Sequence, residues 1–244
     1  MKFIDSPVFM KLRSIVLVAL NVVPFGKMLR YHIGWFIQNR RNYGNLKFQG
    51  SRSQDMITYL YFKKKSEGFY IDIGANNGIS LSNTYVFEKL GWDGICVEPQ
   101  YDVFQELKRT RKCYMYNVAV DANSGEADFF QDDVDLGSKL MTSNVNIARE
   151  KRRGTIIKVK TLTFDKIMEN HPDVKYIDFM SIDTEGAELR ILESIDFKKY
   201  KFGLITVEDN EKHGVLENFM KTKGYKKFME AVENAGGGGY PVCS

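Results

Sequence analysis

The stretch Phe69-Tyr-Ile-Asp-Ile-Gly-Ala-Asn-Asn-Gly78 decides the fold that we expect for this chain. Its first five residues are apolar apart from one aspartate, and they predict a buried strand. The loop that follows leads into residues 79–90, whose apolar spacing predicts a helix that Gly91 ends. A strand, a tight glycine-bearing loop and a helix in this order form the first unit of an α/β fold.

Strands and helices continue to alternate after this unit. Further strands are predicted over residues 94–98, 114–120, 176–182, 202–207 and 225–229. Further helices are predicted over residues 101–111, 164–169, 187–194 and 215–222. In the middle of the chain two β segments, 126–130 and 155–161, flank an irregular polar stretch, Gln131 to Gly154. The alternation predicts a doubly wound, mostly parallel sheet with helices on both faces.

Charge divides the chain into a basic front and a mildly acidic body. Nine basic residues and one acidic residue lie up to Gln54, a charge of +8, and the remaining 26 basic and 30 acidic residues give −4. We expect three parts: a basic, apolar and helical N-terminal segment (1–48), the α/β domain (49–235) and a flexible glycine-rich tail (236–244). This balance argues against a nucleic-acid-binding surface spread over the protein.

The N-terminal segment carries features of a membrane-surface anchor. The 13 uncharged residues from Ser14 to Gly26 are too few for a membrane span, which needs about 20. They resemble the apolar region of a signal peptide, but no small-residue cleavage site follows. Trp35 and Phe36 lie among basic residues, as in helices that bind the membrane interface. Peripheral membrane contact through residues 1–41 and packing of a helix on the domain both stay open.

Cysteine and histidine usage excludes two classes of site. The three cysteines are too few and too scattered for a disulfide framework or a zinc site, and the three histidines lie equally far apart. A reducing compartment is the simplest interpretation. We therefore expect a cytoplasmic protein, with membrane association as the open question.

Polar residues at the ends of the first two strands predict a ligand site, because ligands of open α/β sheets bind outside the carboxyl ends of the strands. The glycines of the loop from Gly74 to Gly78 let a ligand approach the backbone, and Asp72 adds a carboxylate at the same edge. The spacing Gly-x-x-x-Gly fails the pyrophosphate fingerprint by one glycine, which disfavours a nicotinamide cofactor. Glu98, twenty residues after Gly78, is placed to accept hydrogen bonds from a ribose diol.

These features indicate a ligand with a ribose and a zwitterionic arm but no pyrophosphate. S-adenosyl-L-methionine fits this description. Its ribose would bond Glu98, its amino-acid part would meet the loop at residues 74–78, and the carboxylates at this edge tolerate its sulfonium charge.

An ordered series of motifs runs through the body of the chain. It comprises Ser53-Gln-Asp55, Phe69 to Gly78, Ser82-Asn-Thr-Tyr85, Phe87-Glu-Lys89, Gly91-Trp92, Gly94 to Pro99, Asn117 to Val120, Gly125-Glu126, Val159 to Leu162 and Ile177 to Glu188. The series resembles the FkbM-type methyltransferase family over about residues 50–230. The resemblance implies a class I, Rossmann-like methyltransferase fold and S-adenosylmethionine-dependent O-methylation, often of sugar hydroxyls. The glycine tail stands where the fold's final antiparallel hairpin is expected, so we expect a short or missing last strand.

The same resemblance assigns cofactor-binding positions. They fall on Asp72, Gly74, Asn76, Gly78 and Glu98, with Val120 and Asp121 where the adenine usually lies, and with Gln54 closing the pocket from the preceding helix.

Acids after two later strands are candidates for the chemistry. Asp183 is the leading candidate for the catalytic centre, as base, metal ligand or acceptor anchor, and Glu185 and Glu208 come next. His213 suits a base near neutral pH, although a surface histidine in a charged loop is the commoner case. Magnesium held by Asp183 and Glu208 or Asp209 would suit oxygen ligands.

The sequence thus favours O-methylation of a hydroxyl of a sugar, glycan or glycosylated metabolite. Residues 131–154 would form a lid over the acceptor or, equally, a surface loop. A nitrogen or small non-sugar acceptor is one alternative, and a non-catalytic, membrane-attached binding protein on the same fold is another.

Overall fold

The computed structural model describes residues 46–50, 53–63, 65–132, 138–141, 154–208, 214–231 and 240–243. The chain divides into two compact units, residues 1–47 with 234–236 and residues 48–233 with 237–244. The described residues belong to the second unit, apart from 46 and 47. The expected N-terminal helical segment and its membrane contact therefore lie almost wholly outside the described residues. No described helix is both long enough and apolar enough to cross a membrane.

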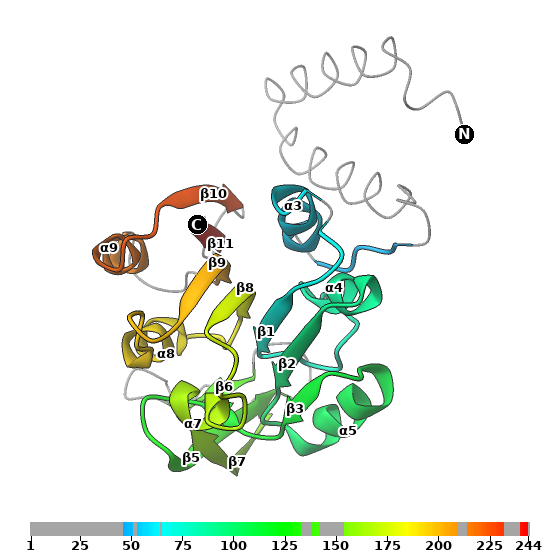
Figure 1. The fold of residues 1–244 in the computed structure, drawn as a ribbon. Helices are drawn as coiled ribbons and strands as arrows, with labels where there is room; N and C mark the ends of the chain where they lie inside the picture. The colour runs from blue at the N-terminus through cyan, green and yellow to red at the C-terminus, as the bar shows by residue number, and fades with distance from the viewer. Residues whose placement is uncertain are drawn as a thin grey trace, which may run out of the picture. The chain divides into compact units, whose positions relative to one another are not determined.

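A seven-stranded sheet forms the centre of the second unit (Figure 1). Its strands are, in spatial order, β10 (Lys227–Ala231), β11 (Tyr240–Cys243), β9 (Lys201–Val207), β8 (Tyr176–Ile182), β1 (Phe69–Ile73), β2 (Asp93–Val97) and β3 (Tyr114–Tyr116). All neighbouring pairs are parallel except those of β11, which runs antiparallel to both β9 and β10. This order confirms the predicted class I methyltransferase fold, a mostly parallel sheet with a final antiparallel hairpin.

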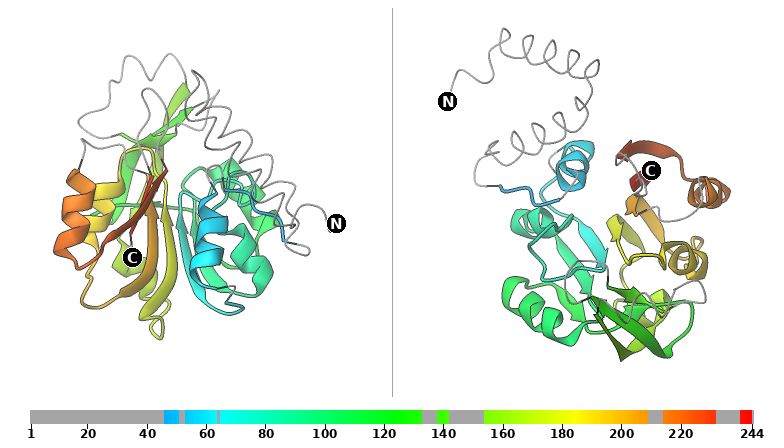
Figure 2. Two further views of the ribbon diagram at one scale, coloured as in Figure 1. Left: turned by 90° about the horizontal axis from the view of Figure 1, so that it is seen from above. Right: turned by 180° about the vertical axis from the view of Figure 1, so that it is seen from behind.

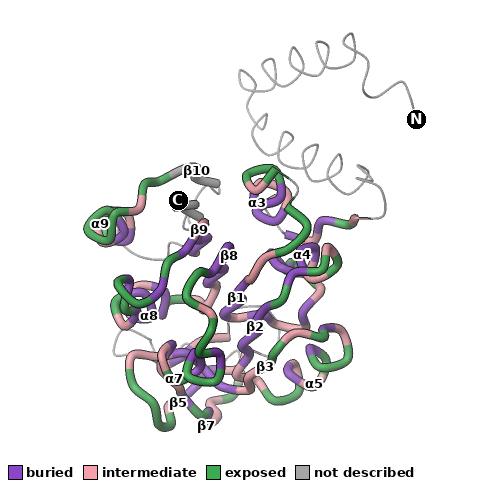
Figure 3. The backbone as a smooth tube through the Cα atoms, viewed as in Figure 1, coloured by how far each residue is buried: buried purple, intermediate pink, exposed green. Residues whose placement is uncertain are grey.

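Helices cover both faces of this sheet, as predicted (Figures 1 and 2). On one face lie α3 (Gln54–Tyr61), α4 (Tyr85–Leu90) and α5 (Tyr101–Thr110), and on the other lie α7 (Phe164–Met168), α8 (Glu188–Ser194) and α9 (Val215–Thr222). Because side chains alternate along a strand, Ile71 and Ile73 join the core under α7 to α9. Their neighbours Tyr70 and Asp72 face the α4 side, where contacts with Thr84 and Arg111 are made. The central strands are buried along most of their length (Figure 3).

A second, four-stranded sheet is inserted after β3. Its order is β4 (Ala119–Val120), β7 (Gly154–Leu162), β5 (Gly125–Asp132) and β6 (Lys139–Leu140). The single strand predicted over 114–120 is therefore wrong, since its two ends belong to different sheets. Asn117 lies at the break, and its Nδ2 donates to the carbonyl oxygens of Glu98 and Pro99.

The stretch 131–154 is less irregular than we expected. Its first two residues extend β5, and β6 pairs antiparallel with Phe129 and Phe130 of β5. The reason is apolar burial, because Phe130 and Leu140 are both buried. Residues 133–137 and 142–153 lie outside the described residues, so the predicted lid stays a prediction.

The helix predicted from residue 79 begins only at Tyr85. Before it, the side-chain oxygen of Asn77 accepts from the backbone N–H groups of residues 79 and 80, and Leu81 has a positive φ of 58°. Ser82 Oγ then accepts from the N–H groups of Thr84 and Tyr85. Such side-chain-to-backbone bonds compete with helical ones, which is why apolar spacing alone misplaced the start of the helix.

The tail is also corrected in part. Residues 240–243, which we expected in a flexible tail, form β11 between β9 and β10. The final strand that the glycine run put in doubt is therefore present. Its backbone completes hydrogen bonds that an edge at β9 would otherwise leave open.

A buried arginine holds the α4 side of this sheet together. Arg111 follows α5, and only 3% of its surface is exposed. Its guanidinium donates to five groups: Glu88 Oε2 at 2.9 Å, Tyr70 Oη at 2.8 Å, Thr84 Oγ1 at 3.0 Å, the Gly78 carbonyl at 3.0 Å and Ser82 Oγ at 3.3 Å. One side chain thereby joins a central strand, the loop between residues 78 and 84, and α4.

We expect Arg111→Met to destabilise the domain by about 3–5 kcal/mol. The change removes the charged partner of the part-buried Glu88 carboxylate and leaves buried oxygen acceptors of Tyr70, Thr84 and Gly78 with one donor fewer. Urea unfolding followed by circular dichroism measures the change. The control is Arg109→Met on the exposed side of α5, which should change stability by less than about 0.5 kcal/mol. Equal losses in the two variants would contradict the role given to Arg111.

Candidate functional site

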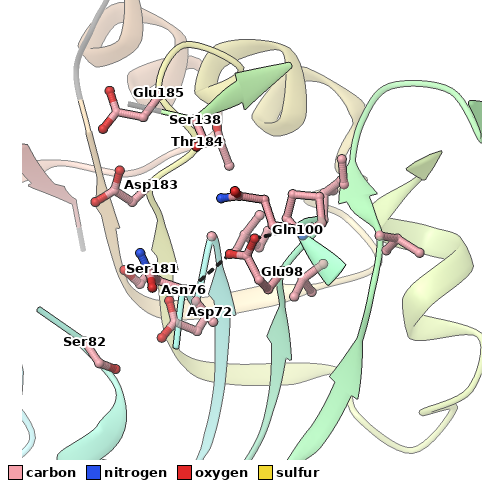
Figure 4. Close-up of a pocket in the computed structure, with 18 of the residues that line it drawn as sticks. Asp72, Asn76, Ser82, Glu98, Gln100, Ser138, Ser181, Asp183, Thr184 and Glu185 are labelled. Atoms are coloured by element: carbon pink, nitrogen blue, oxygen red, sulfur yellow. Dashed lines mark hydrogen bonds between the residues drawn. The ribbon is translucent and has the colours of Figure 1, made fainter. Parts of the chain in front are cut away.

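A cavity opens at the carboxyl ends of β1, β2 and β8 (Figure 4). The chain leaves β1 toward β2 on one side, whereas β8 pairs with β1 on the other, so the strand order reverses here. Ligands of open α/β sheets bind at such a switch point. The cavity therefore lies where the sequence predicted a ligand site.

The loop after β1 forms the floor of the cavity. Gly74 has a positive φ of 86°, and a Cβ at this position would overlap the carbonyl oxygen of Asp183. The backbone N–H groups of Gly74 and Ala75 both donate to the Val97 carbonyl at 3.0 Å. Only glycine at position 74 allows the close approach to the Asp183 carbonyl. Together with the two hydrogen bonds to Val97, this approach brings the ends of β1, β2 and β8 together.

Glu98 lies at the end of β2 and faces the cavity, as predicted (Figure 4). It is 4% exposed, and its two carboxylate oxygens accept backbone hydrogen bonds from Asn76 at 3.0 Å and Gln100 at 2.9 Å. Burial raises the pKa of Glu98 to about 7, and the nearby Asp72 carboxylate raises it as well. The carboxylate is thus fixed in orientation, and its remaining lone pairs are available to a ligand.

An apolar wall extends from Glu98 across both sheets. It consists of Val97, Val118, Val120, Phe129 and Leu140. Val120 had been predicted for the adenine, whereas Phe129 and Leu140 come from the inserted sheet and were missed. Phe129 lies in a predicted β segment and Leu140 in a stretch that we expected to be irregular, so the sequence did not show that the two residues meet.

Three carboxylates gather after β8 and β9. Oxygen atoms of Asp183, Glu185 and Glu208 all lie within 4.8 Å of one another. Asp183 and Glu185 line the cavity. Burial raises the pKa of Asp183 well above its usual range, and the carboxylates of Glu208 and Glu185 raise it further. The predicted grouping of these three residues thus holds, whereas His213 and Asp209 lie outside the described residues.

Glu188 fixes the loop that carries these acids. It is 1% exposed, and its Oε1 accepts from the Thr184 N–H at 2.9 Å, the Thr184 hydroxyl at 2.9 Å and the Gly186 N–H at 3.0 Å. The sequence did not distinguish this buried carboxylate from an ordinary acid in the first turn of a helix.

Three predicted cofactor positions are not among the residues that line the cavity. Gln54 is buried at the start of α3. Gly78 packs on α5, where a Cβ would lie 2.6 Å from Leu107, and its carbonyl accepts from Arg111. Asp121 forms an ion pair with Arg190 at 2.9 Å. Their part in ligand binding stays a prediction, whereas Asp72, Gly74, Asn76, Glu98 and Val120 do line the cavity.

Comparisons with known proteins bear on the family to which this chain belongs. The family model for the methyltransferase FkbM domain matches residues 72–227. A comparison with curated protein sequences gives no significant match.

Several solved structures are similar in fold. Precorrin-6Y C5,15-methyltransferase from Geobacter metallireducens is 11% identical, with a TM-score of 0.41 over 79% of this chain and 87% of that one. Ribosomal protein L11 methylase from Lactobacillus delbrueckii subsp. bulgaricus is 11% identical, with a TM-score of 0.41 over 82% of each chain. A methyltransferase from Pyrococcus furiosus is 12% identical, with a TM-score of 0.40 over 90% of this chain and 98% of that one. Similarity this low does not indicate a shared acceptor.

Proposed function

Because the chain belongs to the FkbM family of S-adenosylmethionine-dependent methyltransferases, we propose that it methylates a hydroxyl oxygen of a sugar, glycan or glycosylated metabolite. The observation that carries the proposal is the group of three carboxylates beside the cavity, Asp183, Glu185 and Glu208. A hydroxyl is a poor nucleophile unless a base takes its proton. Acceptor-rich groups such as these also bind the several hydroxyls of a sugar.

The residues present fit the cofactor. Glu98 offers fixed acceptor oxygens for a ribose diol, and the apolar wall from Val97 to Leu140 suits a purine. Glycine at position 74 lets the loop after β1 pack directly against the Asp183 carbonyl at the edge of the cavity. When bound, S-adenosylmethionine supplies an electrophilic methyl group on a positively charged sulfur.

Asp183 is the group proposed to take the hydroxyl proton. Its pKa is raised by burial and by the neighbouring carboxylates, which makes its ionised form a stronger base than an ordinary aspartate. The proton passes to an Asp183 carboxylate oxygen as the acceptor oxygen gains the methyl group. Glu188 holds Thr184 and Gly186 through hydrogen bonds and so limits movement of this segment during the reaction.

A divalent cation is a second way in which the same carboxylates could act. Three oxygen ligands from Asp183, Glu185 and Glu208 suit magnesium, which would polarise the acceptor hydroxyl. As a base, Asp183 alone would take the proton, whereas a metal site would need Asp183, Glu185 and Glu208 together as ligands.

Nitrogen or a small non-sugar molecule is the competing acceptor class. Labelled-methyl transfer to fractionated lysate, followed by mass spectrometry of the product, distinguishes an O-methyl sugar from these products. A labelled product without a sugar would overturn the proposed acceptor.

We expect cofactor affinity to weaken below neutral pH. With a pKa of about 7, the Glu98 carboxylate is mostly protonated at pH 6 and mostly ionised at pH 8. Protonation removes acceptor capacity needed by the ribose hydroxyls, so the Kd of S-adenosylhomocysteine should rise about tenfold from pH 8 to pH 6. Isothermal titration calorimetry measures this Kd. The Glu98→Gln variant should bind more weakly at pH 8 and show a flatter pH dependence; a pH-independent wild-type Kd would contradict the assignment.

Asp183→Asn should lower kcat by about 100-fold or more, because the amide cannot accept the hydroxyl proton. Calorimetry should show that cofactor binding is retained. Asp183 contacts Gly74 through its backbone carbonyl, which the substitution does not change. Glu193→Gln, on the exposed side of α8, is the matched control and should leave kcat unchanged. Unchanged turnover in Asp183→Asn would exclude this residue as the base.

Activity measured in the presence of a chelator distinguishes the mechanism with Asp183 as base from the mechanism with a bound metal ion. If magnesium is held by the three carboxylates, activity is expected to fall in chelator and to return when magnesium is added. Full activity in chelator would end the metal proposal and leave Asp183 as the base.

A further inference from the structure

Left-handed backbone is concentrated at the cavity. Five described residues other than glycine have a positive φ: Ser53, Lys63, Asn76, Leu81 and Glu185. Three of them, Asn76, Leu81 and Glu185, line the cavity. This conformation costs free energy for most residues other than glycine and asparagine, and such strain is typical of functional sites.

Leu81 is the least expected of these residues. Its φ is 58°, and leucine has neither the freedom of glycine nor the short polar side chain that lets asparagine adopt this conformation. It is not a core residue, because 46% of its surface is exposed. Packing in the interior therefore does not explain a leucine here. At the cavity, its apolar side chain is available to a ligand.

A segment before α3 holds this strained residue in place. Gly50 forms an isolated parallel bridge with Leu81. The buried Asp55 carboxylate, in the first turn of α3, accepts from the Gly50 N–H at 2.9 Å. A Cβ on Gly50 would lie 2.8 Å from Asp55 Oδ1 and 2.9 Å from Asn83 Oδ1, so a larger residue would push the two segments apart. Asp55 therefore supports the wall of the cavity through Gly50 and Leu81 without lining it.

Leu81 lies toward the β8 side of the cavity. The chain continues from it to Asn83, which donates to Ser181 of β8 at 3.0 Å. Glu98 follows β2, on the other side of β1. Figure 4 shows Ser82 and Glu98 on opposite sides of the end of β1. With the purine and the ribose at the β2 end, the amino-acid arm of the cofactor extends toward β8 and so toward Leu81.

We propose that the Leu81 side chain packs against the methylene groups of the amino-acid arm of S-adenosylmethionine and so selects ligands that carry this arm. The proposal rests on the proposed function. The arm carries its charges at the far end, and the methylene groups next to the sulfur gain from an apolar contact. The left-handed backbone at position 81 directs a leucine to them from a loop that Gly50 and Asp55 hold.

Three variants of Leu81 separate ligand contact from backbone strain. In Leu81→Gly the Kd of S-adenosylhomocysteine, measured by isothermal titration calorimetry, should rise at least about fivefold, because the contact of several carbon atoms is lost. Leu81→Asn tolerates the same backbone without the flexibility of glycine and should show the same loss. Leu81→Met restores an apolar side chain and should bind within about twofold of wild type.

Methylthioadenosine tests whether the loss is specific to the arm. It has the purine and the ribose but no amino-acid arm, so its Kd in Leu81→Gly should stay within about twofold of wild type. This result also shows that the variant is folded.

Lys63→Gly is the matched control for the backbone. Lys63 has a φ of 49° and is not among the residues that line the cavity. Both glycine variants relieve a left-handed backbone, so their thermal midpoints should be close to or above that of the wild type. Only Leu81→Gly should lose affinity for S-adenosylhomocysteine.

Each other outcome overturns the assignment. Equal weakening of both ligands, or a thermal midpoint of Leu81→Gly well below that of Lys63→Gly, would make Leu81 a structural residue only. Unchanged binding of S-adenosylhomocysteine would exclude Leu81 from the ligand site. Failure of the wild-type protein to bind either nucleoside would instead overturn the proposed function itself.

Discussion

The hydrogen bonds of the buried Arg111 guanidinium are the interaction on which the α4 side of the central sheet depends. A charge in a low-dielectric interior is tolerated only when its hydrogen-bond donors are satisfied. Here the planar group reaches Glu88 of α4, Tyr70 of β1 and the segment between Gly78 and Thr84. That segment is not helical, so these bonds supply order that a helix would otherwise provide.

The fixed segment in turn shapes the cavity. Thr84 Oγ1 donates to Asp72 at 2.5 Å, and burial raises the pKa of that carboxyl while Arg111 and Thr84 act in the opposite direction. Next to Thr84, Asn83 reaches across to Ser181 of β8. The hydrogen bonds that hold this side of the sheet together therefore also fix side chains that line the cavity.

Apolar spacing in the sequence predicted a helix or strand correctly where the residues of that element alone determine its bounds. The run from Phe69 to Ile73 is a strand as expected, and α9 begins and ends where its apolar spacing indicated. Apolar spacing predicted the structure wrongly where hydrogen bonds from side chains or from a distant segment determine the bounds of an element. Apolar spacing could not show that Asn77 and Ser82 side chains capture the backbone before α4, or that residues 240–243 pair with β9.

The sequence by itself determined the fold class, the strand-end residues Asp72, Glu98 and Asp183, and the cofactor class, because alternation and glycine spacing are local properties of the chain. Only the tertiary structure decided which groups meet. It placed Phe129 and Leu140 of the inserted sheet in the cavity lining together with Val97, and it joined Asn83 to Ser181 of β8. Such contacts join residues far apart in the chain, and their distances follow from packing rather than from spacing along the sequence.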